Sequence, residues 1–207
     1  MFTIETNQLK ALLLCAGKKD IRYYLNGVHF ESTPSGIIAV STDGHRLLAI
    51  NLPHQFESNL NVTIPRELLD QAVKTKSLVI DILIDGDKVT LSSNGQSLNG
   101  QAWDASIVYP DFRRVIPNSV TGETGSQFDN ESLVNFDKIG KLINGGKASV
   151  LQNSGDAALV MFNNDNTIGV LMPMLHDLPA ALSRPAWLDI TEPLKEVKQY
   201  LKPAIKF

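Results

Sequence analysis

Short runs of alternating hydrophobic and polar residues lead into helical stretches, and this succession recurs along the chain. Residues 2–5 alternate as a half-buried strand does. Thr6 stands where it can cap a helix over residues 7–16, and Gly17 follows as a helix-ending residue. The first segment therefore predicts a strand that runs directly into a helix.

The same pattern starts three more times. Residues 61–64 alternate, and Pro65 then opens a helix that runs to about Lys74, at a position where its missing N–H does no harm. Residues 127–129 precede a third helix, with Asp129 or Asn130 as its cap and Asn144-Gly145-Gly146 as its stop. The apolar face of this helix is formed by Leu133, Phe136, Ile139, Leu142 and Ile143.

The fourth start is residues 187–190, followed by Thr191-Glu192-Pro193 and a helix to about Leu201. Strand hairpins lie between the helices, with turns at residues 85–87 and 163–166, and residues 118–125 are the best linker candidate. The predicted fold class is α+β, with repeats of strand, helix and antiparallel strands. The alternative is a generic α+β domain in which the similarity between units is coincidental.

Composition restricts the function classes. The chain is 43% hydrophobic and 20% charged, and one cysteine allows no intrachain disulfide, which fits a reducing cytoplasm. We expect no secretory signal at residues 1–8, and no stretch approaches the length of a membrane span. A net charge of -3 argues against a surface coated in positive charge but allows a local basic lining.

The segment Thr42-Asp43-Gly44-His45-Arg46-Leu47 stands between two apolar runs, and Asp-Gly in that setting is first a hairpin turn. A hydrolase would use Asp43 and His45 as an acid-base pair, but no nucleophile motif accompanies them. The four histidines are scattered without the spacing of a metal site. We therefore expect no enzyme, no cofactor and no metal.

Four segments, in chain order, resemble the walls of the peptide groove of the bacterial DNA polymerase III beta subunit, the sliding clamp. They are Arg22-Tyr23-Tyr24-Leu25-Asn26-Gly27, the segment from Thr42 to Leu47, Tyr109-Pro110-Asp111-Phe112-Arg113-Arg114-Val115-Ile116-Pro117, and Val170-Leu171-Met172-Pro173-Met174. The resemblance implies a groove whose first side is Leu25, Thr42, Gly44, His45, Arg46 and Leu47. It implies a floor of Pro110, Arg114 and Val115, and a far side of Val170, Met172, Pro173 and Met174.

The resemblance also implies a domain organisation. Residues 1–118 are similar to the middle domain of the clamp, and residues 119–207 to part of its last domain with an extra C-terminal helical tail. The clamp's first domain and the first half of its last domain have no counterpart. Leu175 replaces the arginine that often follows Met-Pro-Met in the family.

In clamps such helices line a hole for duplex DNA, and lysines neutralise phosphates there without reading bases. The resemblance implies two kinds of DNA-facing residue. Tyr23, Tyr24 and Arg66 match positions that lie near DNA in the family, and Lys10, Lys74, Lys138 and Lys141 accompany the helices. For any single lysine, a solvated helix face is the alternative.

The function expected from the resemblance is that of a DNA replication accessory protein, a processivity factor. It would encircle or bind duplex DNA and tether a DNA polymerase, or other proteins with clamp-binding peptides, through the groove; a clamp loader is a further expected partner. The alternative is a non-ring decoy or regulator that competes for clamp partners or the clamp loader. Family rings contain twelve helices, so four helices per chain, with the tail helix included, would give a homotrimer. Three helices per chain would give a tetramer or no ring.

Overall fold

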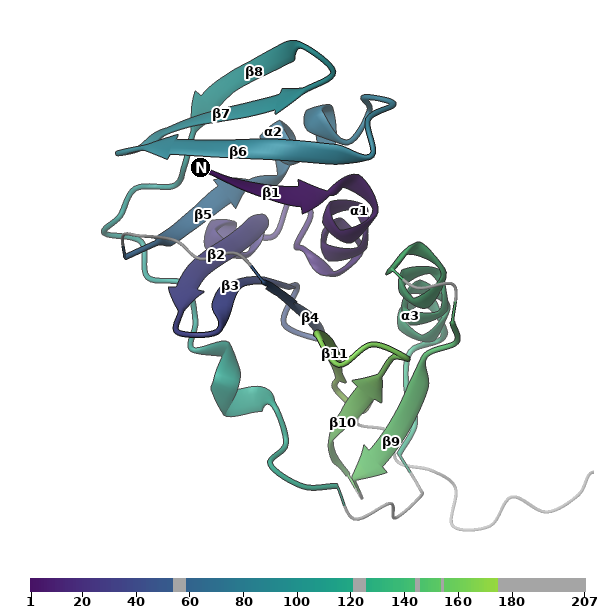
Figure 1. Cartoon of the computed structure of the whole chain (residues 1–207). Helices are drawn as coiled ribbons and strands as arrows, with labels where there is room; N and C mark the ends of the chain where they lie inside the picture. Colours follow the sequence, from purple (N-terminus) through teal and green to yellow (C-terminus); the bar gives the residue numbers. More distant parts are fainter. Residues whose placement is uncertain (54–58, 121–125, 144–145, 154, 175–207) are drawn as a thin grey trace, which may run out of the picture. The chain divides into compact units, whose positions relative to one another are not determined.

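The computed structural model (Figure 1) describes residues 1–53, 59–120, 126–143, 146–153 and 155–174. Two strand-helix-meander units are followed by a third unit, in which an isolated bridge at Gln127 stands in place of the leading strand. The first comprises β1 (Phe2–Glu5), α1 (Thr6–Cys15), β2 (Gly27–Thr33), β3 (Gly36–Thr42) and β4 (Arg46–Leu52). The second comprises β5 (Asn61–Pro65), α2 (Arg66–Ala72), β6 (Val79–Asp85), β7 (Lys88–Ser93) and β8 (Gln96–Gln101).

The third unit comprises α3 (Asn130–Ile143), β9 (Ser149–Asn153), β10 (Asp156–Met161) and β11 (Thr167–Leu171). These elements confirm the predicted α+β class and the strand-helix repeats. The predicted fourth strand and helix, in residues 187–201, lie outside the described residues.

The strands of the described residues form two antiparallel sheets, ordered β1-β6-β7-β8 and β5-β2-β3-β4-β11-β10-β9. The first two units exchange their first strands, because β1 pairs with β6 and β5 pairs with β2. The third unit joins through β11, which pairs with β4 so that Val170 stands opposite Leu47. This pairing carries one sheet across from the first unit to the third.

The core explains why α1 forms where it does. Leu9, Leu12 and Cys15 are 0% exposed, and Leu13 is 5% exposed, so the helix is covered almost all round. It contacts α2, the strands of the first unit and α3, which lies beside it in Figure 1. Each of its buried leucines stabilises the fold by about 1.5–3 kcal/mol.

Two predicted helix ends are wrong. Thr6 does not cap α1: it is the first helical residue, and Glu5 is the cap. The Glu5 N–H donates to the Gln8 side chain at 3.2 Å, and the Glu5 carboxylate accepts the Gln8 N–H in return. Helix α2 ends at Ala72 rather than near Lys74. The Ala72 carbonyl, at this helix end, accepts a hydrogen bond of 2.8 Å from the Thr75 hydroxyl.

Of the two caps considered for α3, the structure uses Asp129. Its carboxylate accepts the Ser132 N–H at 2.8 Å and the Ser132 hydroxyl at 2.9 Å. The helix ends at Ile143, directly before the Asn-Gly-Gly stop of the sequence.

Candidate functional site

An apolar cavity of about 220 Å³ lies where the 3₁₀ turn Tyr23–Leu25, the β3–β4 hairpin, the segment after Tyr109 and the end of β11 meet. The predicted groove residues around it are Leu25, Thr42, Gly44, Arg46, Leu47, Pro110, Val115, Val170 and Met172. Four further residues line it: Arg22, Tyr24, Asp111 and Phe112. Four chain segments thus build one hollow, although 148 positions separate Tyr24 from Met172 in the numbering.

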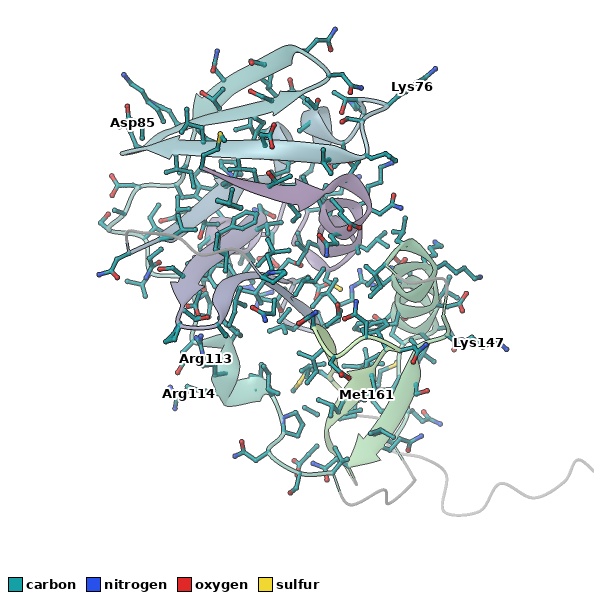
Figure 2. All side chains as sticks on the ribbon, viewed as in Figure 1. Lys76, Asp85, Arg113, Arg114, Lys147 and Met161 are labelled. Atoms are coloured by element: carbon teal, nitrogen blue, oxygen red, sulfur yellow. The ribbon has the colours of Figure 1, made fainter. Side chains whose placement is uncertain are left out.

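Four predicted groove residues do not line this cavity: His45, Arg114, Pro173 and Met174. The main chain of His45 still shapes the rim, because its carbonyl accepts the Met172 N–H at 2.8 Å. Arg114 projects from the short 3₁₀ helix Phe112–Val115 and is exposed (Figure 2). Met174 is 40% exposed and donates its N–H to the Gln127 carbonyl.

The hairpin turn is held by the Asp43 carboxylate. It accepts the main-chain N–H groups of His45 and Arg46 at 2.9 and 3.0 Å, and the Arg46 Nε–H at 2.9 Å. Arg46 is thereby fixed beside the cavity, and its Nη1 also approaches the Ser132 hydroxyl of α3 at 3.4 Å. Asp43 is thus engaged in the turn as a carboxylate acceptor, a structural role that differs from an acid-base pair with His45.

Arg22 supports the same turn from outside. Its guanidinium makes two hydrogen bonds to the Asp20 carboxylate, at 3.1 and 2.7 Å, and a third to the Asp43 carbonyl at 2.9 Å. This pairing with Arg22 lowers the pKa of Asp20 to about 2. Arg22 was not among the predicted groove residues; the one signal that could have found it is its place directly before Tyr23-Tyr24-Leu25.

The floor segment is fastened to β2. Tyr109 stacks on His29 with ring centroids 4.5 Å apart, and Phe112 is 5% exposed. Arg113, on the same 3₁₀ helix as Arg114, pairs with the Glu31 carboxylate (Figure 2). The segment that carries Phe112 and Val115 to the cavity is therefore held against β2 by the side chains of Tyr109 and Arg113.

His29 is the buried ionisable group beneath this floor. Its Nδ1 lies 2.9 Å from the Thr63 hydroxyl, and the whole residue is only 4% exposed. Burial lowers the pKa of His29 to about 4; the Glu31 carboxylate opposes this shift and Arg113 adds to it. The imidazole is therefore neutral at pH 7.

A second hollow, of about 490 Å³, lies among α1, α2 and α3. Lys10, Lys138 and Lys141 line it, above Leu13, Leu14, Val73 and Leu142. Asp70 shares the hollow, and Lys141 is paired with Asp137 at 2.6 Å. Three of the predicted DNA-facing lysines are thus brought together, in company with carboxylates that weaken their field.

The other predicted DNA-facing residues lie elsewhere. Arg66 Nη1 donates to the carbonyls of Leu13 and Ala16, at 2.8 and 2.9 Å, so this guanidinium satisfies the end of α1. Tyr23 packs edge-on against Trp103, Tyr24 lines the apolar cavity, and Lys74 lies in the turn after α2.

Among the described residues, no group of three His, Cys, Asp or Glu side chains is placed to hold a metal ion. No helix in the described part of the chain is both long and apolar enough to cross a membrane.

Comparison with known proteins defines the class. The family model for the central domain of the DNA polymerase III beta subunit matches residues 3–111. The beta sliding clamp of Salmonella typhimurium is 29% identical over 134 residues, which cover 57% of this chain and 34% of that protein. The Escherichia coli clamp is 28% identical over 132 residues, with the same two coverages.

Solved structures agree on the fold. The clamp of Pseudomonas aeruginosa bound to griselimycin has a TM-score of 0.67 at 21% identity and covers 84% of this chain and 65% of that one. The Borrelia burgdorferi beta subunit in complex with a natural product has a TM-score of 0.69 at 16% identity, covering 84% and 64%.

The fold is therefore that of a DNA clamp. The chain belongs to the DNA polymerase III beta subunit family, which confirms the resemblance drawn from the sequence. The family consists of clamp subunits rather than enzymes, and this confirms the prediction of a non-enzymatic protein. The chain spans about one third of the length of the curated relatives that it matches.

Proposed function

We propose that the protein is a clamp-like DNA replication accessory protein that captures DNA polymerase, or other replication proteins, by a short linear peptide. The observation that carries this proposal is the apolar cavity with its charged rim. At about 220 Å³ it is smaller than the usual small-molecule pocket, and it suits one or two apolar side chains of a peptide.

The chemistry of the walls supports a peptide ligand. Leu47 and Val170, 2% and 1% exposed, form a firm base, while Met172 is 40% exposed and can adapt to an entering leucine or phenylalanine. Arg22 stands at the rim, where its guanidinium can reach peptide carbonyls. Capture at such a site would raise the local concentration of a polymerase at its template.

Weak, sequence-independent contact with duplex DNA is the second part of the proposal. Lys10, Lys138 and Lys141 lie close together at the helix hollow, and phosphates are neutralised by such clusters without base readout. Binding to the clamp loader, a homotrimeric ring and a cytoplasmic location belong to the same proposal. So does a boundary near residue 118 between a middle-domain unit and a partial last-domain unit that extends to residue 207.

A decoy or regulator is the second candidate function. It is favoured by the built groove, which alone is enough to compete for the peptides of clamp partners. Such a protein would bind clamp partners or the clamp loader without encircling DNA. Binding of the peptide is common to both candidates, and persistence on circular DNA separates them, because only a closed ring is trapped on a circle.

The test is titration of a labelled peptide of the clamp-binding type, a glutamine followed by leucines and a phenylalanine. We expect a dissociation constant on the order of micromolar, because the flexible peptide loses conformational entropy on binding. Met172→Ala should weaken binding by about tenfold or more. The matched control is Met161→Ala, a methionine 38% exposed on β10 and outside the cavity, which should bind normally (Figure 2). Absence of binding by the unmodified chain would refute the proposal.

A further inference from the structure

The floor segment, residues 109–115, is a wall between two hollows. Asp111 and Phe112 line the apolar cavity on one side, and on the other side they line a polar hollow of about 450 Å³. Glu31 and Arg113 line the polar hollow but not the apolar cavity. A change at these two charged residues can therefore alter the cavity wall without removing any group that lines the cavity.

The main chain of the floor segment pairs with no strand of the described residues. The Arg114 N–H donates to the Asp111 carbonyl at 3.3 Å. The Ile116 N–H donates to the Arg113 carbonyl at the same distance. Because these hydrogen bonds are local, the position of the segment relative to the sheet depends on its side chains.

Phe112 is the side chain of the floor segment that is buried against the base of the cavity. It is 5% exposed and belongs to one hydrophobic cluster with Leu47 and Val170. The Arg113 guanidinium lies over its ring, with Cζ 4.5 Å from the ring centroid, a distance at which the cation is attracted to the aromatic face. The place of this guanidinium therefore bears directly on the place of the Phe112 ring.

Glu31 determines where the guanidinium lies. Its carboxylate pairs with Arg113, and its side chain is 18% exposed, whereas that of Arg113 is 51% exposed. Glu31 stands in β2 between two paired strands, opposite Ile38 of β3 and Asn61 of β5. The carboxylate is thus attached to the interior of a sheet, and the arginine is the partner that can move.

We propose that Glu31 is a positioning residue for peptide binding, which acts from outside the cavity by holding Arg113 over Phe112. Without the carboxylate, the half-exposed guanidinium would turn to water and leave the Phe112 ring uncovered on its polar side. The stability of the fold should change little, because an ion pair with one half-exposed member contributes little to it. The inference rests on the proposed capture of a peptide at the apolar cavity.

Titration of the glutamine-leucine-phenylalanine peptide is the first test. Glu31→Gln should weaken binding by about fivefold or more, with a nearly unchanged temperature of thermal unfolding. Arg113→Met keeps an apolar stem without the charge and should bind as weakly as Glu31→Gln. The double variant should bind no more weakly than either single variant, because the two residues act in series.

Asp137→Asn is the matched control, since it removes a carboxylate from the ion pair with Lys141 on α3, outside the cavity. It should bind the peptide normally. Glu31→Gln with the affinity of the unmodified chain would overturn the proposal. So would losses of affinity that add up in the double variant, because independent residues would then be responsible.

Fluorine NMR tests the position of Phe112 without a peptide. The chain has eight phenylalanines, and labelling with 4-fluorophenylalanine gives each a signal, of which Phe112→Tyr identifies one. This signal should shift in Glu31→Gln and in Arg113→Met and stay in place in Asp137→Asn. An unshifted Phe112 signal in Glu31→Gln would overturn the positioning role. Absence of peptide binding by the unmodified chain would instead refute the proposed function, so the two failures are distinguishable.

Discussion

Arg22 donates a hydrogen bond of 2.9 Å to the Asp43 carbonyl and lies directly against Gly44. A β-carbon on Gly44 would stand 2.7 Å from Arg22 Nη1 and 2.9 Å from Nη2. The φ of Gly44 is 90°, in the region that side chains rarely adopt. The glycine therefore serves two purposes, a turn conformation and room for the guanidinium at the cavity rim.

Gly44→Ala should lower the free energy of unfolding by about 1–2 kcal/mol, through backbone strain and displacement of Arg22. It should also weaken binding of the peptide, because the displaced guanidinium lines the cavity. Denaturant unfolding and peptide titration measure the two effects.

Gly86→Ala is the matched control, since Gly86 has a φ of 62° but no atom within 4 Å of an added β-carbon. It should lose stability through strain alone and bind the peptide normally. Equal peptide affinities for the two variants would show that Arg22 does not shape the site.

Arg66 was predicted to face DNA, but in the structure its guanidinium donates hydrogen bonds to the carbonyls at the end of α1. Arg66→Ala should destabilise the protein by about 1–3 kcal/mol, because the buried carbonyls of Leu13 and Ala16 lose a charged donor. Thermal unfolding gives the loss, and Lys138→Ala, at an exposed lysine, provides the comparison with little expected change. If Arg66→Ala unfolds at the same temperature as the unmodified chain, Arg66 does not have this role.

The helix hollow gives a separate prediction on DNA. Lys10→Ala combined with Lys138→Ala should weaken binding to duplex DNA and flatten its salt dependence, because fewer counterions are released on binding. Filter binding at several salt concentrations measures both. Replacing Lys88, which lies on the β6–β7 hairpin away from the hollow, is the control. An unchanged salt slope would mean that the two lysines are a solvated face.

Local pattern was sufficient for most of the fold. The turns at Gly86 and at residues 163–166 and the end of α3 could be predicted because proline, glycine and alternating residues act over a few positions. The N-cap of α1 could not, because Glu5 and Thr6 are both plausible until the reciprocal Glu5–Gln8 bonds are seen. The strand exchange between units is a long-range pairing, and alternation alone does not indicate which strand is the partner.

The candidate site was only partly predictable for the same reason. Leu47 and Val170 could be assigned through the family resemblance, and they stand opposite one another in adjacent strands. Arg22 was missed because its partner, the Asp43 carbonyl, is 21 positions away in the chain. The Arg113–Glu31 pair spans 82 positions, and no local pattern could relate these residues.

His29 makes stability depend on pH. Burial lowers its pKa from the ordinary 6.5 to about 4, and the charged groups that face it are Glu31, 3.9 Å from Nε2, and Arg113. Between these pH values the unfolded chain binds a proton at His29 that the folded chain does not. The free energy of unfolding should therefore fall as the pH is lowered from 6.5 to 4, by up to about 3 kcal/mol.

His29→Phe should remove this part of the pH dependence, because an aromatic ring still stacks on Tyr109 but no longer titrates. Urea unfolding at several pH values between 6.5 and 4 measures the slope for both proteins. His45→Phe replaces an exposed histidine and should leave the contribution of His29 in place. Since Tyr109 begins the segment that forms the cavity floor, peptide binding should weaken over the same pH range in the unmodified chain and remain level in His29→Phe. If the free energy of unfolding falls equally with pH in His29→Phe and in the unmodified chain, groups other than His29 cause the loss of stability in acid.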